Sequence, residues 1–383
     1  MTYLFASQLN ATTNEMLWCA ILGLTAQYLY HMIDHSRYAT DYQFLKSEVL
    51  FRVPQVYDFD VGHLTPAGFK TTVLNKTGLT KEGSKNVGRN PLGSFEHYRI
   101  VPLYDYRFYM YRHWSIYEAM AKSPYIVSHV SYWRGRNDLI ELLAKIGLRK
   151  ADGESPYKSI QVESRTNFHD KIPLYHASFG IPQLYFETFC KYQPMEVNAA
   201  DVVYCVTSIL SKCDPSINQQ TFESLAPNQQ TPNYDEYYRK KSSDQLKLNF
   251  WEGYDAICDS ETFKRIIQNA LDTEDFIIQQ AIDVWQKNKI SKTTSLRYCF
   301  LEDASPILMN PHSLSLLLNI LVNMSKTFSK NSKHTQKPMI MVAHDSHSPA
   351  YLVVGWHPDP AKKMYVERRK AMEDSFTSPL LAC

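Results

Sequence analysis

The stretch NEMLWCAILGLTAQYLYHMIDH (residues 14–35) joins an apolar run to two histidines that flank an aspartate. The uncharged part, residues 16–26, is too short to cross a bilayer, because a membrane-spanning helix needs about 20 apolar residues. No Lys or Arg precedes the run, which argues against a secretory signal. The stretch is therefore expected inside a folded protein.

The apolar residues of this stretch have helical spacing. One face is formed by Leu17, Ile21, Leu24 and Tyr28. Thr13 or Asn14 can cap the start of such a helix. We therefore predict a helix that is buried on most of its faces.

Composition indicates an ordinary folded chain. Its 383 residues are 44% hydrophobic and 21% charged, enough for one large domain or two. The net charge of +2 neither requires nor excludes an anionic partner, so any nucleic-acid contact would be local. The 7 cysteines never occur as C-x-x-C, which favours reduced thiols over a disulfide framework or a zinc ribbon.

The first half of the chain is predicted to be predominantly helical. Apolar spacing predicts a helix in the aromatic segment 104–120 and another that Gly147 ends. Residues 58–95 are rich in Gly and contain Pro66 and Pro91, so we predict a long loop insertion there.

The second half is predicted to mix helices and strands, which makes the fold class α+β. We expect helices from Ala199 and over 261–286 and 311–328. Strands are expected in LYFETFCKY, LRYCFLE, KPMIMVAH and AYLVVGW, and residues 345–349 should connect a hairpin. The Gln-, Asn-, Pro- and Ser-rich segment 214–247 is predicted to be a mobile loop.

Two histidine clusters are candidate metal sites. His31 and His35 are spaced to share a helix face, in an order similar to the H-x-x-E-H zinc motif with Asp in place of Glu. The second cluster is VAHDSHS, with His344, Asp345 and His347 after a strand. We favour a solvent-facing helix end for the first, which has no third ligand nearby, and a polar turn for the second.

Neither a phosphate-binding loop, nor a dinucleotide fingerprint, nor a G-x-S-x-G elbow occurs in the sequence. We therefore predict no catalytic residue, no metal ligand and no cofactor.

The best local patch for nucleic acid lies in residues 134–150. Its basic candidates are Arg134, Arg136, Lys145 and Arg149. Such clusters neutralise phosphates, and neighbouring Tyr132 and Trp133 could stack on bases. A helix with a solvated basic side is the alternative interpretation.

Five segments, taken together and in order, resemble the cell division control protein 45 family of eukaryotic replication factors. They are NEMLWCAILGLTAQYLYHMIDHSRYATD, YDYRFYMYRHWSIYEAM, YIVSHVSYWRGRNDLIELLAKIGL, AADVVYCVTSIL and SPILMNPHSLSLLL. The likeness extends over most of the chain, and no single segment decides it.

The resemblance implies a nuclear, non-catalytic relative of RecJ-type DHH phosphoesterases. Members join the Mcm hexamer and the GINS complex in the replicative helicase and act on chromatin. The resemblance also implies that residues 1–183 form a helical region for helicase contacts and that residues 184–383 form a DHHA1-like domain. Nothing in the chain corresponds to the family's amino-terminal DHH-like domain.

Three residues are candidates for partner binding, because aromatic and Arg side chains anchor many protein interfaces: Tyr109, Arg112 and Trp114. Single-stranded DNA binding is a further expectation for the basic segment. The alternatives are an active DHH-type phosphoesterase that cleaves single-stranded nucleic acid and a zinc hydrolase built on His31 and His35.

Overall fold

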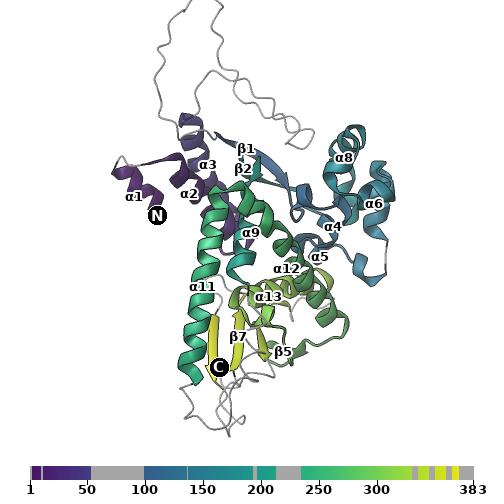
Figure 1. Cartoon of the computed structure of the whole chain (residues 1–383). Coiled ribbons are helices and arrows are strands. Elements are labelled where there is room, and N and C mark those ends of the chain that lie inside the picture. Colours follow the sequence, from purple (N-terminus) through teal and green to yellow (C-terminus); the bar gives the residue numbers. More distant parts are fainter. Residues whose placement is uncertain are drawn as a thin grey trace, which may run out of the picture. The chain divides into compact units, whose positions relative to one another are not determined.

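The computed structural model describes residues 2–9, 12–52, 99–135, 137–192, 196–212, 234–329, 335–344, 350–358 and 365–370 (Figure 1). The chain divides into two compact units. The first contains residues 1–126, 135–206 and 255–267, and the second contains 127–134, 207–254 and 268–383. Both units draw on segments from either side of residue 183, and the DHHA1-like assignment of residues 184–383 stays a prediction.

The first unit begins with three helices: α1 (Thr2–Gln8), α2 (Asn14–Leu29) and α3 (His35–Arg52). The prediction of a buried helix in the opening stretch is confirmed by α2, which buries Leu17, Trp18 and Ile21. Its cap is Thr13, whose hydroxyl accepts the N–H of Met16 at 3.2 Å.

A three-stranded antiparallel sheet follows, in the order β1 (Arg99–Tyr106), β2 (Tyr185–Tyr192), β3 (Val197–Asn198). The predicted strand at 184–192 is confirmed by β2, but the predicted aromatic helix over 104–120 is wrong. Its first residues belong to β1, which alternates between buried and partly exposed side chains and pairs with β2 along its whole length. After β1, the left-handed backbone of Met110 (φ 44°) prevents one continuous helix.

Short helices complete the first unit and lead into the second. They are the 3₁₀ turns Tyr111–His113, Tyr132–Arg134, Tyr157–Ser159 and His176–Phe179, with α4 (Ile116–Ala121), α5 (Pro124–His129), α6 (Asp138–Ile146), α7 (Lys150–Glu154) and α8 (Val162–Tyr175). The predicted end of α6 is confirmed, because Gly147 adopts φ 87° there. This left-handed conformation favours glycine, which has no Cβ to clash.

Three longer helices come next: α9 (Ala199–Leu210), α11 (Tyr234–Cys258) and α12 (Ser260–Gln286). The predictions of α9 and α12 are confirmed. The predicted loop over 214–247 is wrong from Tyr234 onward, because that residue begins α11. Proline is absent from α11, so the polar composition that suggested a loop is compatible with a helix. The first part of that loop and the predicted insertion at 58–95 lie outside the described residues.

The second unit contains a five-stranded sheet in the order β4 (Ser291–Lys292), β5 (Arg297–Leu301), β6 (Met339–His344), β7 (Ala350–Trp356), β8 (Tyr365–Lys370). The pair β5 and β6 is parallel, and a 3₁₀ turn (Pro306–Met309) and α13 (Pro311–Phe328) connect them. Parallel neighbours need such a crossover. Figure 1 shows α13 beside this sheet, and it contacts β6 and β7.

The core of the second unit lies between α12, α13 and one face of the sheet. Its fully enclosed side chains include Ile278, Leu317, Cys299 and Met341. The predicted strands β5, β6 and β7 and the predicted helix α13 are confirmed, whereas β4 and β8 were missed. The predicted α+β fold class is confirmed. Within the described ranges, no helix is long and apolar enough to cross a membrane.

Candidate functional site

The histidines of HMIDH do not share a helix face. Helix α2 ends at Leu29, and His31 adopts a positive φ of 57° in the turn before α3. Asp34 has a local role, because its Oδ1 accepts the N–H of Arg37 at 2.8 Å at the start of α3. The predicted solvent-facing helix end is confirmed, since His31, Asp34 and His35 are exposed.

The second histidine cluster is only partly described. The ring of His344, at the end of β6, stacks on Tyr351 of β7 with 4.4 Å between ring centres. Asp345 and His347 lie outside the described residues, although β6 and β7 are antiparallel neighbours, as a hairpin requires. In the part of the chain that the structure describes, no group of three or more His, Cys, Asp or Glu could hold a metal ion.

The partner-binding candidates lie around a buried ionic network in the first unit. Both oxygens of Asp105 accept hydrogen bonds from Arg112, each at 3.0 Å. Asn198 donates to the same carboxylate at 2.8 Å, and Asp201 lies 3.9 Å from the guanidinium. Segments far apart in sequence thus meet at Asp105.

Burial and ion pairing have opposite effects on the pKa values in this network. Burial raises the pKa of Asp105, and the guanidinium of Arg112 counteracts this rise. Burial alone would lower the pKa of Arg112, but the neighbouring Asp105, Tyr111 and Asp201 raise it well above its usual value. Arg112 therefore stays charged and compensates the buried carboxylates.

The other two partner-binding candidates pack beside this network. Tyr109 is 3% exposed, and its ring centre lies 4.3 Å from that of Tyr204. Trp114 is half-buried and forms a T-shaped contact with Tyr109, with 6.4 Å between ring centres. All three candidates thus have packing or charge roles within the fold. Partner binding by Tyr109, Arg112 and Trp114 stays a prediction.

The basic candidates do not form one cluster within either unit. Arg134 is exposed in the second unit, where its guanidinium lies over the rings of Trp133 and Phe328 at 4.8 and 5.3 Å. Lys145 and Arg149 belong to the first unit. Nucleic-acid binding by these residues stays a prediction, and Arg136 lies outside the described residues.

The two basic candidates of the first unit, Lys145 and Arg149, each form an ion pair with an acidic neighbour. Lys145 pairs with Glu141 at 3.4 Å. Arg149 donates two hydrogen bonds to Asp152, at 2.8 and 3.1 Å, and these raise its pKa. A phosphate would have to compete with these carboxylates.

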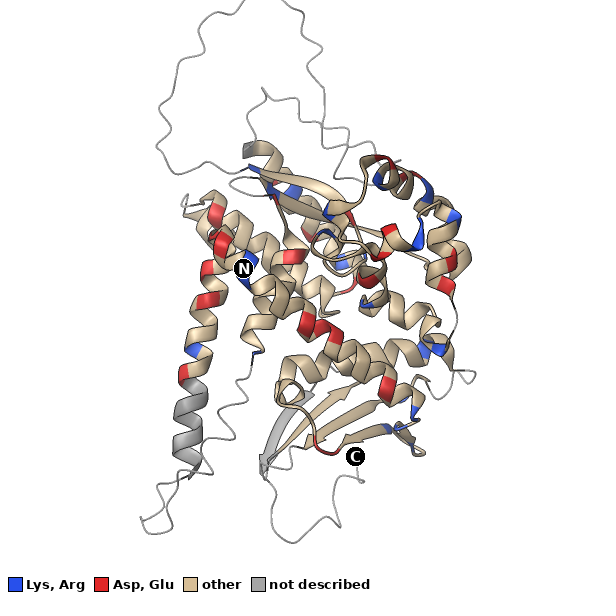
Figure 2. Ribbon diagram, turned by 45° about the vertical axis from the view of Figure 1, so that its right-hand side comes forward, with Lys and Arg blue, Asp and Glu red and all other residues tan. Residues whose placement is uncertain are grey.

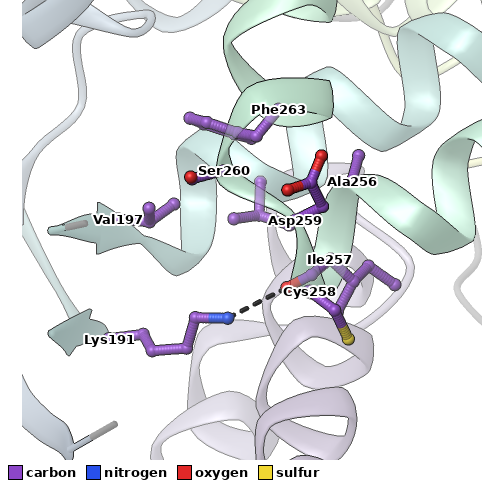
Figure 3. A pocket seen from close by; sticks show the side chains of 9 residues that line it. Lys191, Val197, Ala256, Ile257, Cys258, Asp259, Ser260 and Phe263 are labelled. Atoms are coloured by element: carbon purple, nitrogen blue, oxygen red, sulfur yellow. Dashed lines mark hydrogen bonds between the residues drawn. The ribbon is translucent and has the colours of Figure 1, made fainter. Parts of the chain in front are cut away.

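A small pocket lies in the first unit, at the corner where α11 ends and α12 begins (Figure 3). The ammonium of Lys191, on β2, donates to the carbonyl of Ile257 at 3.0 Å, and Figure 3 shows it reaching this last turn of α11. Burial lowers the pKa of Lys191. Asp259 caps α12 by accepting the N–H of Thr262 at 2.7 Å. Hydrogen bonds from the side chain and then from the backbone of Thr262 lower the pKa of Asp259.

The polar groups of this pocket are therefore used to end one helix and start the next. Lysine near a helix C-terminus and aspartate at a helix N-terminus both complement the helix dipole. The remaining walls include the apolar side chains of Val197, Val202, Ala256 and Phe263. We assign the corner a structural role.

Sequence reasoning missed a surface on α11. Several large apolar side chains there are more than half exposed: Leu246, Leu248, Phe250, Trp251 and Tyr254. The spacing of Leu246, Phe250 and Tyr254, four residues apart, could have revealed the helix. The predicted loop 214–247 included Leu246, and no element was predicted for the residues that contain Phe250 and Tyr254.

Comparison with known proteins gives consistent results. The family model for CDC45 matches residues 1–376. The cell division control protein 45 homologs of Dictyostelium discoideum and Homo sapiens are 26% and 23% identical to this chain, over 89% and 88% of its length. These matches cover 50% and 51% of the two relatives, so the chain spans about half their length.

A solved structure has a similar fold. The crystal structure of CDC45 from Entamoeba histolytica superposes with a TM-score of 0.62 at 18% identity, covering 94% of this chain and 60% of that protein.

Proposed function

Because this chain belongs to the CDC45 family, we propose that it is a non-catalytic DNA replication factor that acts in the nucleus. The observation that carries the proposal is the family match over residues 1–376, supported by a similar fold along 94% of the chain. Any motif found in one segment alone would be weaker support.

The finer proposal is that the chain acts as a structural subunit. It would join the Mcm hexamer to GINS in the replicative helicase, on chromatin at initiation and during elongation. Exposed Arg134, beside the rings of Trp133 and Phe328, supports contact with single-stranded DNA, because a guanidinium and aromatic rings suit phosphates and bases.

Co-purification tests the proposal. The tagged full chain should retrieve Mcm and GINS subunits from cells of its own organism. As a matched control, Leu317→Asp places a charge in the closed core of the second unit and should abolish retrieval by unfolding that unit. A folded chain that retrieves neither complex would contradict the proposed assembly.

The non-catalytic part has its own test, Mn²⁺-dependent cleavage of single-stranded DNA by the purified chain. We expect no cleavage above background. Cleavage that disappears in His344→Ala would instead favour the phosphoesterase alternative.

A further inference from the structure

Helix α11 turns a polar and small-residue face inward. Asn249, Gly253 and Ala256 are buried, and the Asn249 amide donates to the carbonyl of Lys212 at 2.9 Å. Gln245 supports it by donating to the Asn249 side-chain oxygen at 2.8 Å. Most amphipathic helices place these polar groups in water and their apolar stripe in the core.

The outward face of α11 is apolar. Leu246, Phe250 and Tyr254 repeat every four residues, and Trp251 extends their face sideways. We call these four residues the α11 stripe. Each is between 53% and 59% exposed, and such contiguous exposure is typical of interaction sites.

The rings of the α11 stripe support one another. Phe250 and Trp251 lie 5.3 Å apart between ring centres, Trp251 and Tyr254 lie 5.9 Å apart, and Phe250 stacks on Tyr254 at 6.4 Å. These mutual contacts restrict the rings before any partner arrives. Preordered aromatic side chains lose less conformational entropy on binding.

One long edge of the α11 stripe is acidic. Helical geometry places Asp244, seven residues before Trp251, and Asp255, four residues after it, beside Trp251 on the side away from Leu246. Lys247 pairs with Asp244 at 3.1 Å. From residue 244 to its end, α11 carries the acidic residues Asp244, Glu252 and Asp255 and the basic residue Lys247, and Figure 2 marks acidic and basic positions on this helix in red and blue.

We propose that the α11 stripe binds an amphipathic helix of another protein, one whose apolar face is flanked by Lys or Arg. The stripe runs about 12 Å along the axis, which matches roughly two turns of a helical partner. Apolar anchors would supply affinity, and the acidic edge would select basic flanks. The inference uses only the geometry and charge of α11 and does not depend on the proposed function.

The test uses two synthetic peptides and the full chain. Both are 14-residue amphipathic helices of two heptads, with Leu at the first, fourth and fifth positions of each heptad. One peptide has Lys at the remaining positions, and the other has Glu. Fluorescence anisotropy should show at least tenfold tighter binding of the Leu/Lys peptide. Increasing salt should narrow the difference, because exposed charges are screened.

Substitutions locate the binding surface. Trp251→Ala should weaken Leu/Lys binding at least tenfold, as expected for a central aromatic anchor. Asp255→Asn should weaken it severalfold and reduce its salt dependence. Leu174→Ala is the matched control, since Leu174 is 72% exposed on α8, away from the α11 stripe in sequence, and should have no effect.

Three results would overturn the proposal. These are equal affinity for the two peptides, equal losses in Trp251→Ala and Leu174→Ala, or a dimer of the chain that dissociates in Trp251→Ala. The third result, read by light scattering, would assign the α11 stripe to a second copy of this chain.

Discussion

At the scale of single residues, buried charge has two different solutions in this chain. In the first unit, Arg112 compensates Asp105 through two hydrogen bonds of 3.0 Å. In the second unit, Glu274 of α12 is 6% exposed, and burial raises its pKa to about 8. The first carboxylate has a cation beside it, whereas the second is accommodated by holding its proton.

Glu274 therefore makes stability depend on pH. Its pKa is about 8 in the folded chain against 4.5 as the ordinary value, so between these values the folded chain binds the proton more tightly. The contribution of Glu274 to folding stability should decrease as the pH rises through that window, by roughly 1 kcal/mol per pH unit. His169 and His312, whose pKa values burial lowers to about 4, change stability in the opposite direction. Urea unfolding at pH 5 and pH 8, followed by tryptophan fluorescence, measures the net change.

Two substitutions in α12 isolate the effect. Glu274→Gln removes only the Glu274 contribution, so relative to the unchanged chain this variant should be more stable at pH 8 than at pH 5. Glu261→Gln changes a carboxylate whose side chain is 77% exposed in the same helix and should follow the unchanged chain at both pH values. If all three proteins lost the same stability between pH 5 and pH 8, the assignment to Glu274 would be wrong.

At the scale of elements, sequence patterns predicted those helices and strands whose formation depends on their own residues. Helices α2, α6, α12 and α13 and strands β5, β6 and β7 follow from the spacing or type of their own residues. The partner of β1 comes from a distant segment, because Arg99 pairs with Tyr192 and Tyr106 with Tyr185. Its aromatic residues also fitted a helical face, and only long-range pairing decides for the strand.

Contacts between segments distant in sequence also explain why the burial of the candidate residues was not predicted. Asp105 and Arg112 are near each other in sequence, but Asn198 and Asp201 complete their network from across the chain. Sequence patterns identified Arg112 as an anchor type without showing its burial. Conversely, the α11 stripe was missed because the predicted loop 214–247 included Leu246 and no element was predicted for residues 248–260, where its other members lie.

The inward polar face of α11 yields a prediction about stability. Asn249→Ala would remove the buried amide that donates to the carbonyl of Lys212 and should destabilise the chain by about 1–3 kcal/mol. Leu248→Ala, next to it, should have little effect because its side chain is exposed. Chemical unfolding of both variants measures the difference. A larger loss for Leu248→Ala would mean that α11 packs by its apolar side.

At the scale of the whole molecule, the CDC45 family model matches residues 1–376 of this chain, which spans about half the length of its relatives. Its fold resembles a CDC45 structure over 94% of its length. The fold alone does not assign a function, and the family match is the basis of the proposed structural role. Assembly is therefore the property on which the proposed function depends.

Reconstitution from purified components tests that property most directly. The full chain is mixed with the Mcm hexamer and GINS of its own organism, and the mass of the assembly is measured by light scattering after size exclusion. The account predicts one complex that contains all three components, including one copy of this chain. Elution of the folded chain apart from both Mcm and GINS would contradict it.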